Sequence, residues 1–303
     1  MIEKSVRVQI FSVYYSSQNI IDNSCYNNTC IVTIQTGRES TGISLDMLGD
    51  NSGDNISAKN PDYGELTAWY WVWKNWLPLH KECEYIGFTQ YRRLPVLSSD
   101  NGHYLKHISK QGFLKKAEDF TEDNVIKFIG DSDIVAVKKW NTLVSTEWEF
   151  TSFIPSEDWL WARKCFTGGN SDKEHLFDSI LKKNSARYKC NFIMKTSLFC
   201  EMCSWLFPML FEFESKRITD KSKNQPKIGR ICAYITECFI NLWIDQKEAE
   251  KNVKIKDMCI YEAAFPRKSM QDNLKRLKWF VNIFYHLKNI VYSKQLRGEA
   301  YEE

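Results

Sequence analysis

Short runs of β-branched and aromatic residues alternate with longer segments of helical apolar spacing, and this order limits the possible folds more than any other feature of the sequence. The short runs are typical of buried strands, and the longer segments are typical of amphipathic helices. The expected strands are 6–15, 30–35, 85–89, 133–137, 191–195 and 254–261, and the expected helices are 63–76, 119–129, 155–165, 173–183, 198–216 (broken at Pro208) and 231–244. A chain ordered in this way predicts an α/β fold with a mostly parallel central sheet.

The charge balance excludes proteins that bind nucleic acid over a broad surface. The 303 residues include 41 lysines and arginines and 38 aspartates and glutamates, and the formal net charge is only +3. A general nucleic-acid surface is far more basic, so any anion site must be local and no nucleic-acid partner is expected. The absence of a P-loop and of a G-x-G-x-x-G motif argues against phosphotransfer and Rossmann-type dinucleotide binding.

The ten cysteines do not form a recognisable metal or disulfide framework. Cys200 and Cys203 make one C-x-x-C pair, but a zinc site of this type needs a second pair and the chain has none. No apolar signal sequence precedes them, so we expect reduced thiols and a cytoplasmic location. The one Asp-x-Asp motif, at 131–133, precedes its expected strand, and we interpret it as a helix-to-strand turn.

Residues 263–303 differ in character from residues 1–262, and we expect a basic helical tail behind a single domain. The apolar residues of the tail recur at helical spacing among lysines and arginines. Such a helix either lies on an anionic membrane surface or packs against the domain with a solvated basic face, and the sequence leaves both open. No run of 18 or more apolar residues occurs, so any membrane contact would be peripheral, at the inner face.

The carboxyl end of the strand expected at 85–89 delivers two arginines, Arg92 and Arg93. Ligands of open α/β sheets bind beyond the carboxyl ends of the strands, and guanidinium groups match the oxygens of a diphosphate. We therefore predict that at least one of the two arginines binds an anion. The alternative is that one of them points inward and pairs with a carboxylate such as Glu65.

A polar loop at 49–60 precedes the aromatic segment at 63–76. Its hydrogen-bonding side chains offer acceptors and amide donors that suit ribose, base or sugar hydroxyl groups; they are Asp50, Asn51, Asp54 and Asn55. Aspartate and asparagine also cap their own loops, and this is the structural alternative for these four residues.

These segments carry a long motif, with shorter blocks later in the chain. The matching residues are Gly49-Asp50-Asn51, Gly53-Asp54-Asn55-Ile56-Ser57, Asn60, Tyr63, Glu65-Leu66-Thr67-Ala68, Tyr70-Trp71, Trp73-Lys74-Asn75, Tyr91-Arg92-Arg93, 192–195, 205–208, 236–237 and 241–243. On these residues the chain resembles the capsular polysaccharide synthesis glycosyltransferases, a family defined on a domain of originally unknown function. The resemblance covers residues 5–262, and the departures from the family pattern are Gln90, where the family has His, Gly64, Cys190 with Asn191, and Cys238.

The resemblance implies a GT-A-like fold with a nucleotide-sugar donor, usually uridine-linked, and a growing glycan as acceptor, usually lipid-linked. Some members resemble inverting galactofuranosyltransferases, which suggests hexosyl transfer in capsule, O-antigen or lipopolysaccharide assembly. Carried onto this chain, the donor side comprises Asp50, Asn51, Asp54, Asn55, Glu65, Tyr91, Arg92 and Arg93, and the acceptor side comprises Asn191 and Trp205. Many GT-A enzymes have a metal-binding Asp-x-Asp motif where this chain has residues 90–93, so we expect that the arginines replace the metal and that no cofactor is needed; manganese or magnesium is the alternative.

An inverting transfer needs a general base beside the acceptor hydroxyl, and Glu237 is our candidate. It lies in the apolar helix expected at 231–244, and apolar surroundings raise the pKa of a carboxyl group. The alternative is a structural carboxylate paired with Arg230 or a lysine, and Asp158 and Glu147 are second choices as the base. A different class of function also stays open, namely a non-catalytic protein that binds carbohydrate or nucleotide sugar.

Overall fold

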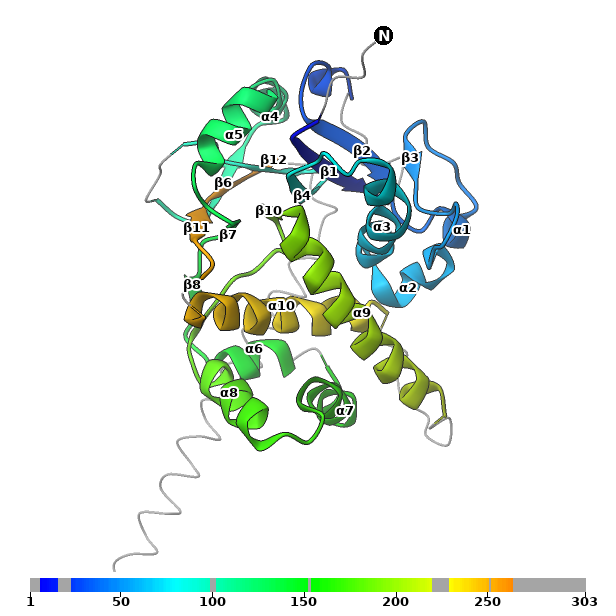
Figure 1. Cartoon of the computed structure of the whole chain (residues 1–303), viewed down its shortest axis with the longest axis vertical. Helices are drawn as coiled ribbons and strands as arrows, with labels where there is room; N and C mark the ends of the chain where they lie inside the picture. The colour runs from blue at the N-terminus through cyan, green and yellow to red at the C-terminus, as the bar shows by residue number, and fades with distance from the viewer. Residues whose placement is uncertain are drawn as a thin grey trace, which may run out of the picture. The chain divides into compact units, whose positions relative to one another are not determined.

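A seven-stranded sheet organises the chain (Figure 1), in a computed structural model that describes residues 6–15, 23–98, 102–151, 154–219, 229–250 and 252–263. The strand order is β11-β7-β10-β4-β1-β2-β3, and all neighbours are parallel except β10, which is antiparallel to β4 and β7. The strands are β1 (Val8–Tyr14), β2 (Ile31–Gln35), β3 (Leu48–Gly49), β4 (Tyr85–Gln90), β7 (Ile134–Val137), β10 (Phe192–Lys195) and β11 (Ile255–Met258). Five of the six expected strands lie in this sheet, and the first half of the sixth joins it as β11, which confirms the prediction of a mostly parallel α/β fold.

A second, three-stranded sheet was not expected from the sequence. It has the order β5-β12-β6 and consists of β5 (Arg93–Pro95), β6 (Leu105–Ile108) and β12 (Ile260–Ala263). The strand expected at 254–261 divides at Cys259, because β11 joins the large sheet and β12 joins the small one. A two-residue ladder of β8 (Trp140–Asn141) and β9 (Ser185–Ala186) completes the strands of the described residues.

The middle of the large sheet is buried on both faces. Every residue of β1 is buried, as expected for a parallel strand covered by helices. Gly87 in β4 lies so close to its neighbours that a Cβ atom there would be 3.0 Å from side-chain carbons of Ile10 and Ile193. Phe88, the next residue, packs its ring against aromatic rings from β1, α3, β10 and α9; these are Phe11, Trp69, Phe192 and Phe199. These aromatic side chains therefore form part of the core around β4.

The aromatic segment 63–76 is not one helix as predicted. It consists of the end of α2 (Asn60–Tyr63), then α3 (Leu66–Trp71), then a π-helical turn, η4 (Val72–Trp76), before the 3-10 turn η5 (Leu77–Leu79). Gly64 separates α2 from α3 with a φ of 55° and a ψ of −132°, a conformation that residues with a Cβ rarely adopt. All six residues of α3 are buried, so the packing of this segment under the sheet determines its path.

The remaining helices follow the expected order, with additions. They are α1 (Arg38–Thr41), α4 (Lys110–Ala117), α5 (Glu122–Ile129), α6 (Thr146–Thr151), α7 (Ser156–Thr167), α8 (Ser171–Leu181), α9 (Thr196–Thr219) and α10 (Ile231–Ala249), with 3-10 turns η2 (Asn23–Tyr26) and η3 (Ser57–Lys59). The predicted break at Pro208 is wrong, because α9 continues through it. Pro208 is exposed, while Leu206, Phe207 and Leu210 around it are buried and hold the helix together.

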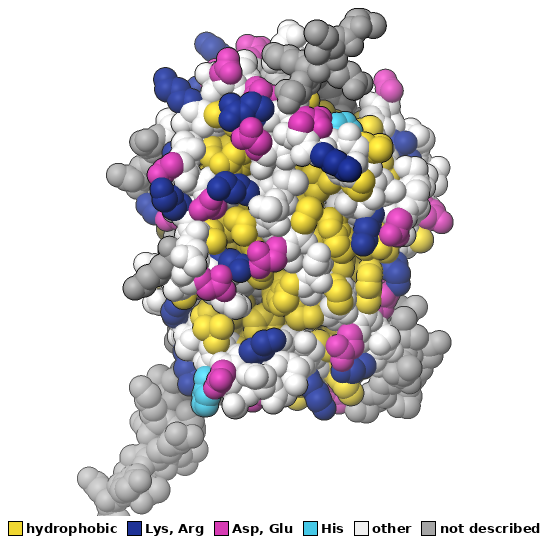
Figure 2. Space-filling view, in the orientation of Figure 1, with side chains coloured by type: hydrophobic (Ala, Val, Ile, Leu, Met, Phe, Trp, Pro, Cys, Tyr) yellow, Lys and Arg dark blue, Asp and Glu magenta, His cyan; other side chains and the backbone are white. Residues whose placement is uncertain are grey.

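Helix α10 lies between the sheet and the group formed by α6, α7 and α8, and it contacts α9 as well (Figure 1). On the face shown in Figure 2, hydrophobic side chains gather in a band through the middle, with charged side chains around it. In the part of the chain that the structure describes, no helix is both long and apolar enough to span a bilayer. The basic tail predicted at 263–303 lies outside the described residues, apart from Ala263.

Candidate functional site

A cavity of about 370 Å³ opens at the carboxyl ends of β1, β2 and β4. This is the place where open α/β sheets bind their ligands. The strand ends contribute Val13, Tyr14, Tyr15, Thr36, Gln90, Tyr91 and Arg92, and the opposite wall consists of Asn60, Pro61, Gly64, Glu65 and Arg230. Three of the predicted donor-side residues, Glu65, Tyr91 and Arg92, are therefore brought together around one cavity.

The two arginines after β4 have different environments. The Arg93 side chain is 3% exposed, and its Nε lies 3.0 Å from Oε1 of Glu262 on β12. The Arg92 side chain is 39% exposed, and its Nε lies 3.3 Å from the same oxygen. The alternative of an inward-pointing arginine therefore describes Arg93, although its partner is Glu262 and not Glu65. Arg92 is the arginine that faces the cavity.

Glu65 links the two walls of the cavity. Its Oε1 accepts a hydrogen bond from Nε2 of Gln90 at 3.1 Å, and its Oε2 accepts one from Nη2 of Arg230 at 2.9 Å. Arg230 immediately precedes α10 in a left-handed conformation, with its N–H bonded to the carbonyl of Pro61 at 2.7 Å. Arg230 is thus the partner of Glu65, and not of Glu237 as one alternative proposed.

Asp50 lies fully buried behind the cavity. Its carboxylate accepts four hydrogen bonds, from N–H of Gly37 at 2.7 Å and of Arg38 at 3.1 Å, and from the hydroxyls of Ser57 and Thr67, both at 2.5 Å. With its acceptor sites occupied in this way, Asp50 ties the polar loop to α3 and to the chain after β2.

The other three loop residues predicted on the donor side, Asn51, Asp54 and Asn55, do not line the cavity. Oδ1 of Asp54 accepts the Tyr70 hydroxyl at 3.0 Å. Asn55 caps its own turn, because its Oδ1 accepts the N–H of Ser57 at 3.1 Å. Asn51 is exposed. The self-capping alternative therefore describes Asn55, whereas Asp54 bonds Tyr70 in α3. Donor contact by these loop residues stays a prediction.

Glu237 projects from α10 towards the segment between β9 and β10. Its Oε1 accepts the backbone N–H of Lys189 at 2.5 Å. Burial raises the pKa of the Glu237 carboxyl above its ordinary value, the charge of Glu65 adds to this, and the N–H and ammonium of Lys189 oppose it. The direction of this pKa shift agrees with the prediction for an apolar helix. Glu237 itself does not line the cavity.

The segment that contacts Glu237 has an uncommon backbone. Lys189 and Cys190 have φ values of 78° and 25°, which residues with a Cβ rarely adopt. Asn191, which is 3% exposed, anchors the segment to β4, because its Oδ1 accepts the Thr89 hydroxyl at 2.8 Å and its Nδ2 donates to the Lys189 carbonyl. Strained conformations of this kind persist where surrounding contacts enforce them, and they are concentrated at functional sites. Asn191 thus hydrogen-bonds Lys189, the residue whose N–H holds Glu237.

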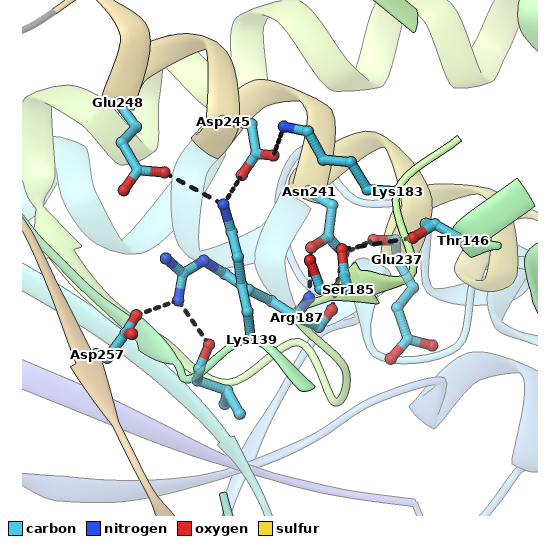
Figure 3. A network of polar contacts seen from close by, with 11 residues as sticks. Lys139, Thr146, Lys183, Ser185, Arg187, Glu237, Asn241, Asp245, Glu248 and Asp257 are labelled. Carbon is cyan, nitrogen blue, oxygen red and sulfur yellow. Dashed lines mark hydrogen bonds and ion pairs between the residues drawn. The ribbon is translucent and has the colours of Figure 1, made fainter. Parts of the chain in front are cut away.

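A polar network holds the other end of this segment (Figure 3). Arg187 donates its N–H to Oδ1 of Asn241, and its guanidinium contacts the Val137 carbonyl at 2.8 Å and Asp257 at 2.5 Å. Beside it, Lys139 bridges Asp245 and Glu248 at 2.7 and 3.2 Å. The segment is consequently fixed on β7, β11 and α10 at once.

A family model described as a domain of unknown function, DUF4422, matches residues 14–248. The chain belongs to this family. The match includes both arginines, Glu237 and the whole cavity lining except Val13. No curated protein matches the chain.

A solved structure described as the apo form of WbbM, a bifunctional glycosyltransferase, has the same fold as this DUF4422 chain. The TM-score is 0.70 at 20% sequence identity, over 87% of this chain and 48% of that chain. The chain thus spans about half the length of the protein that it matches. The likeness supports the expected GT-A-like architecture of the described domain.

Trp205 of the DUF4422 chain does not line the first cavity. It lines a second cavity, of about 300 Å³, together with Trp243, Glu201 and Gln246. The two cavities lie towards opposite ends of α10, and the helical rise places Arg230 and Gln246 about 24 Å apart. The structure therefore separates Trp205 from the first cavity, and its acceptor-side role stays a prediction.

The second-choice carboxylates of the DUF4422 chain differ in their surroundings. Asp158 lies 3.3 Å from Arg217 in an ion pair between α7 and α9. Glu147 is partly buried on α6. Its neighbour Glu149 is the one whose pKa is affected by Glu237. Burial and the charge of Glu237 both raise the pKa of Glu149.

No group of three or more histidine, cysteine, aspartate or glutamate side chains that could hold a metal ion occurs among the described residues. Asp131 and Asp133 lie in the turn between α5 and β7, as predicted, at the opposite edge of the sheet from the cavity. They pair with Lys254 at 2.7 Å and Lys195 at 2.6 Å.

Sequence reasoning missed three charged residues of the site, namely Lys189, Arg230 and Glu262. Arg230 appeared only as a partner for Glu237, and Glu262 lies one residue beyond the expected last strand. The pairing of β12 with β5 places Glu262 opposite Arg93, a residue 169 positions away in the sequence. Lys189 has no local signal in the sequence, because its backbone conformation depends on Asn191 and Glu237.

Proposed function

We propose that the chain is a glycosyltransferase that moves a hexosyl group from a nucleotide sugar to a growing cell-surface glycan. We further propose a UDP-sugar as the donor, with UDP-galactofuranose as the first candidate, and inversion at the anomeric carbon. The observation that carries the proposal is the cavity at the strand ends, with Arg92 and Arg230 in its walls. The likeness to a bifunctional glycosyltransferase supports the same reaction class.

In this proposal the acceptor hydroxyl oxygen attacks the anomeric carbon of the donor. The bond from that carbon to the phosphate oxygen breaks, its electron pair leaves with the nucleoside diphosphate, and the hydroxyl proton passes to Glu237. A single displacement of this kind inverts the anomeric configuration. Arg92 would neutralise the charge that develops on the departing diphosphate, because a preorganised cation acts most strongly where charge appears in the transition state.

We propose that the arginine takes the place of a metal ion. The chemistry of the carboxylates near the cavity supports this, since Asp50 accepts four hydrogen bonds and Glu65 is bonded to Gln90 and Arg230. A divalent cation at the diphosphate would need carboxylate oxygens that are not already bonded in this way.

Calorimetric titration with UDP, in manganese and again in EDTA, tests the donor site. We expect binding that is the same in both conditions, followed by release of UDP when the correct UDP-sugar and acceptor are supplied. Binding that requires manganese would overturn the arginine proposal. Tight UDP-sugar binding without any turnover would support a non-catalytic carbohydrate- or nucleotide-sugar-binding protein instead.

Release of UDP by a Glu237→Gln variant separates the enzyme from the binding protein further. Removal of a general base reduces turnover by about 100-fold or more, whereas donor binding should persist. Glu248→Gln, on the same helix but paired with Lys139, is the matched control and should retain turnover.

We also propose a lipid-linked acceptor and peripheral membrane contact through the basic tail at 263–303. Flotation of the full chain with vesicles that contain 30% anionic lipid, roughly the proportion that gives a strongly negative surface, tests the contact. Charge reversal at Lys275 and Arg276 should abolish flotation. Equal flotation of the wild-type chain and the charge-reversed variant would contradict the proposal.

A further inference from the structure

The second cavity, of about 300 Å³, is built by four helices, and it shares no lining residue with the first cavity. Aromatic side chains from α7, α9 and α10 line it; they are Phe166, Trp205 and Trp243. The first turn of α8 adds Asp172 and Lys173. Pockets for small molecules begin at roughly this volume and combine apolar walls with a few polar groups in the same way.

Two indole rings provide the apolar wall of the second cavity. The Trp205 ring is partly buried, and Phe166 packs against it edge to face, with ring centroids 5.7 Å apart and an angle of 88° between the planes. Trp243 is only 3% exposed although it lines the cavity. Buried tryptophans usually have a hydrogen-bond acceptor, but neither indole N–H donates to any residue in the part of the chain that the structure describes. A ligand that carries hydroxyl groups offers acceptors of this kind.

Charged side chains form the rim of the second cavity. Nζ of Lys247 lies 2.8 Å from Oε1 of Glu201 and 2.9 Å from Oε2 of Glu250, so that it ties α9 to α10. Half of the Glu201 side chain is still exposed. Asp172 and Lys173 are exposed, and neither side chain forms an ion pair within the described ranges. The rim therefore presents both hydrogen-bond donors and acceptors next to the indole rings.

The charges of the second cavity balance, unlike those of the first. Its lining has two acidic and two basic residues, whereas the first cavity has Arg92 and Arg230 against Glu65. A diphosphate is therefore favoured in the first cavity and not in the second. A purely apolar ligand would leave the charged rim without partners. A neutral sugar fits both features, because the C–H face of its ring can stack on an indole while its hydroxyl groups bond the rim.

We propose that the second cavity is a carbohydrate-binding site that holds a neutral sugar unit of the growing glycan, away from the point of transfer. That this glycan is the acceptor rests on the proposed function, whereas the binding of a sugar at Trp205 and Trp243 does not. The helical rise places Arg230 and Gln246 about 24 Å apart along α10, so a single sugar unit cannot occupy both cavities. An earlier unit of the glycan would occupy the second cavity while its end is extended at the first.

Titration with methyl glycosides, followed by saturation-transfer NMR, tests this site. The probes are the methyl glycosides of galactopyranose, galactofuranose, glucose, mannose and N-acetylglucosamine, and we expect the wild type to bind at least one of them. Trp205→Ala should lower that affinity by about 10-fold, as for the loss of stacking on an aromatic ring. Trp161→Ala is the matched control, because Trp161 is exposed on α7 outside the cavity, and it should bind as the wild type does.

A second variant separates binding from folding. Glu201→Ala removes a charged hydrogen-bond acceptor from the rim, so the affinity for the glycoside should again fall by about 10-fold. Its thermal midpoint should not fall, because Glu201 is exposed in the helix and Lys247 keeps its pairing with Glu250. Glu212→Ala, which is exposed on the same helix and paired with Lys216, should retain the affinity. Unchanged affinity in either Trp205→Ala or Glu201→Ala overturns the inference.

Titration of the same proteins with UDP distinguishes this inference from the proposed function. Saturating UDP should not displace the glycoside, and displacement would place the glycoside in the first cavity and overturn the inference. A wild type that binds UDP but none of the glycosides also overturns the inference and leaves the UDP-sugar proposal standing. Glycoside binding that is lost in Trp205→Ala, in a chain that does not bind UDP, supports the inference and overturns the UDP-sugar donor.

Discussion

The side-chain amide of Asn241 pairs with both backbone groups of Arg187: Oδ1 accepts the N–H at 2.6 Å, and Nδ2 donates to the carbonyl at 2.7 Å. The same Nδ2 also donates to the carbonyl of Glu237 at 2.8 Å. One buried amide therefore connects the helical turn that carries the candidate base to the strained segment that hydrogen-bonds that base.

Replacement of Asn241 by Ala should destabilise the chain and reduce turnover. The buried N–H and carbonyl of Arg187 would lose their partner, at a cost of about 2 kcal/mol in the free energy of unfolding. The segment up to Asn191 would then be less well fixed, so the rate should fall more than donor affinity does. Urea unfolding and UDP-release kinetics measure the two effects. Asn184→Ala, at an exposed position of the same connection, is the control and should behave as the wild type.

The two arginines after β4 should respond differently to substitution. Arg92→Ala should lower UDP affinity at least about 10-fold with little change in stability, because its side chain is 39% exposed and faces the cavity. Arg93→Ala should lower the free energy of unfolding by about 2 kcal/mol, because buried Arg93 neutralises Glu262 and bonds Gln90. Calorimetry and urea unfolding of both variants test the contrast, and the same loss of stability in both would contradict it.

The central strands could be predicted from sequence because each is a short run of β-branched and aromatic residues, as in Val8–Tyr14. The small sheet could not, because β5 has three residues including Pro95, and β6 places two adjacent polar residues, Lys106 and His107, between Leu105 and Ile108, without the alternation of a half-buried strand. Both strands are stabilised by pairing with β12, a distant segment of the chain, and a local sequence pattern carries no information on such a pairing. Pro208 shows the converse, since its strong local signal for a helix break is overridden by buried neighbours.

The site could be predicted in part for a similar reason. The rule that ligands bind at strand ends located Arg92, and the apolar helix identified Glu237 as a carboxyl group with a raised pKa. The pairing of the remaining charges depends on contacts across the chain, such as Glu65 with Arg230, which are 165 positions apart. The polar loop was harder to interpret, because residues such as Asn55 suit sugar recognition and turn capping equally well.

Gly87→Ala should destabilise the centre of the sheet. The added Cβ would lie 3.0 Å from side-chain carbons of Ile10 and Ile193 and 3.1 Å from the backbone oxygen of Phe192, all of which are buried. Overpacking of this kind costs about 1–3 kcal/mol, which urea unfolding would detect. Gly112→Ala is the control, because it lies in helix α4, where alanine is favoured over glycine by about 1 kcal/mol. An unchanged midpoint for Gly87→Ala would contradict the packing described for β4.

The raised pKa of Glu237 predicts an acid limb in the pH dependence of turnover. A base must be ionised to accept the acceptor proton, so kcat should fall as the pH drops through the pKa of Glu237. This pKa lies above the ordinary value of 4.5, chiefly because of burial. We therefore expect the limb at a higher pH than an exposed glutamate would give. A kcat that stays constant down to pH 4.5 would contradict the assignment of Glu237 as the base.

The same pKa shift predicts a sign for the pH dependence of stability. The folded chain holds the Glu237 proton more tightly than the unfolded chain, so between the unfolded and folded pKa values folding binds a proton. The contribution of Glu237 to stability is therefore complete below the unfolded pKa and is lost as the pH rises through the folded pKa. Glu237→Gln, which does not titrate, should lose less stability than the wild type between pH 4 and pH 7, roughly the range over which such a carboxyl titrates. Urea unfolding of both proteins across this range measures the difference, and a wild type that gains more stability than the variant would show that Glu237 is not held in the buried environment described for α10.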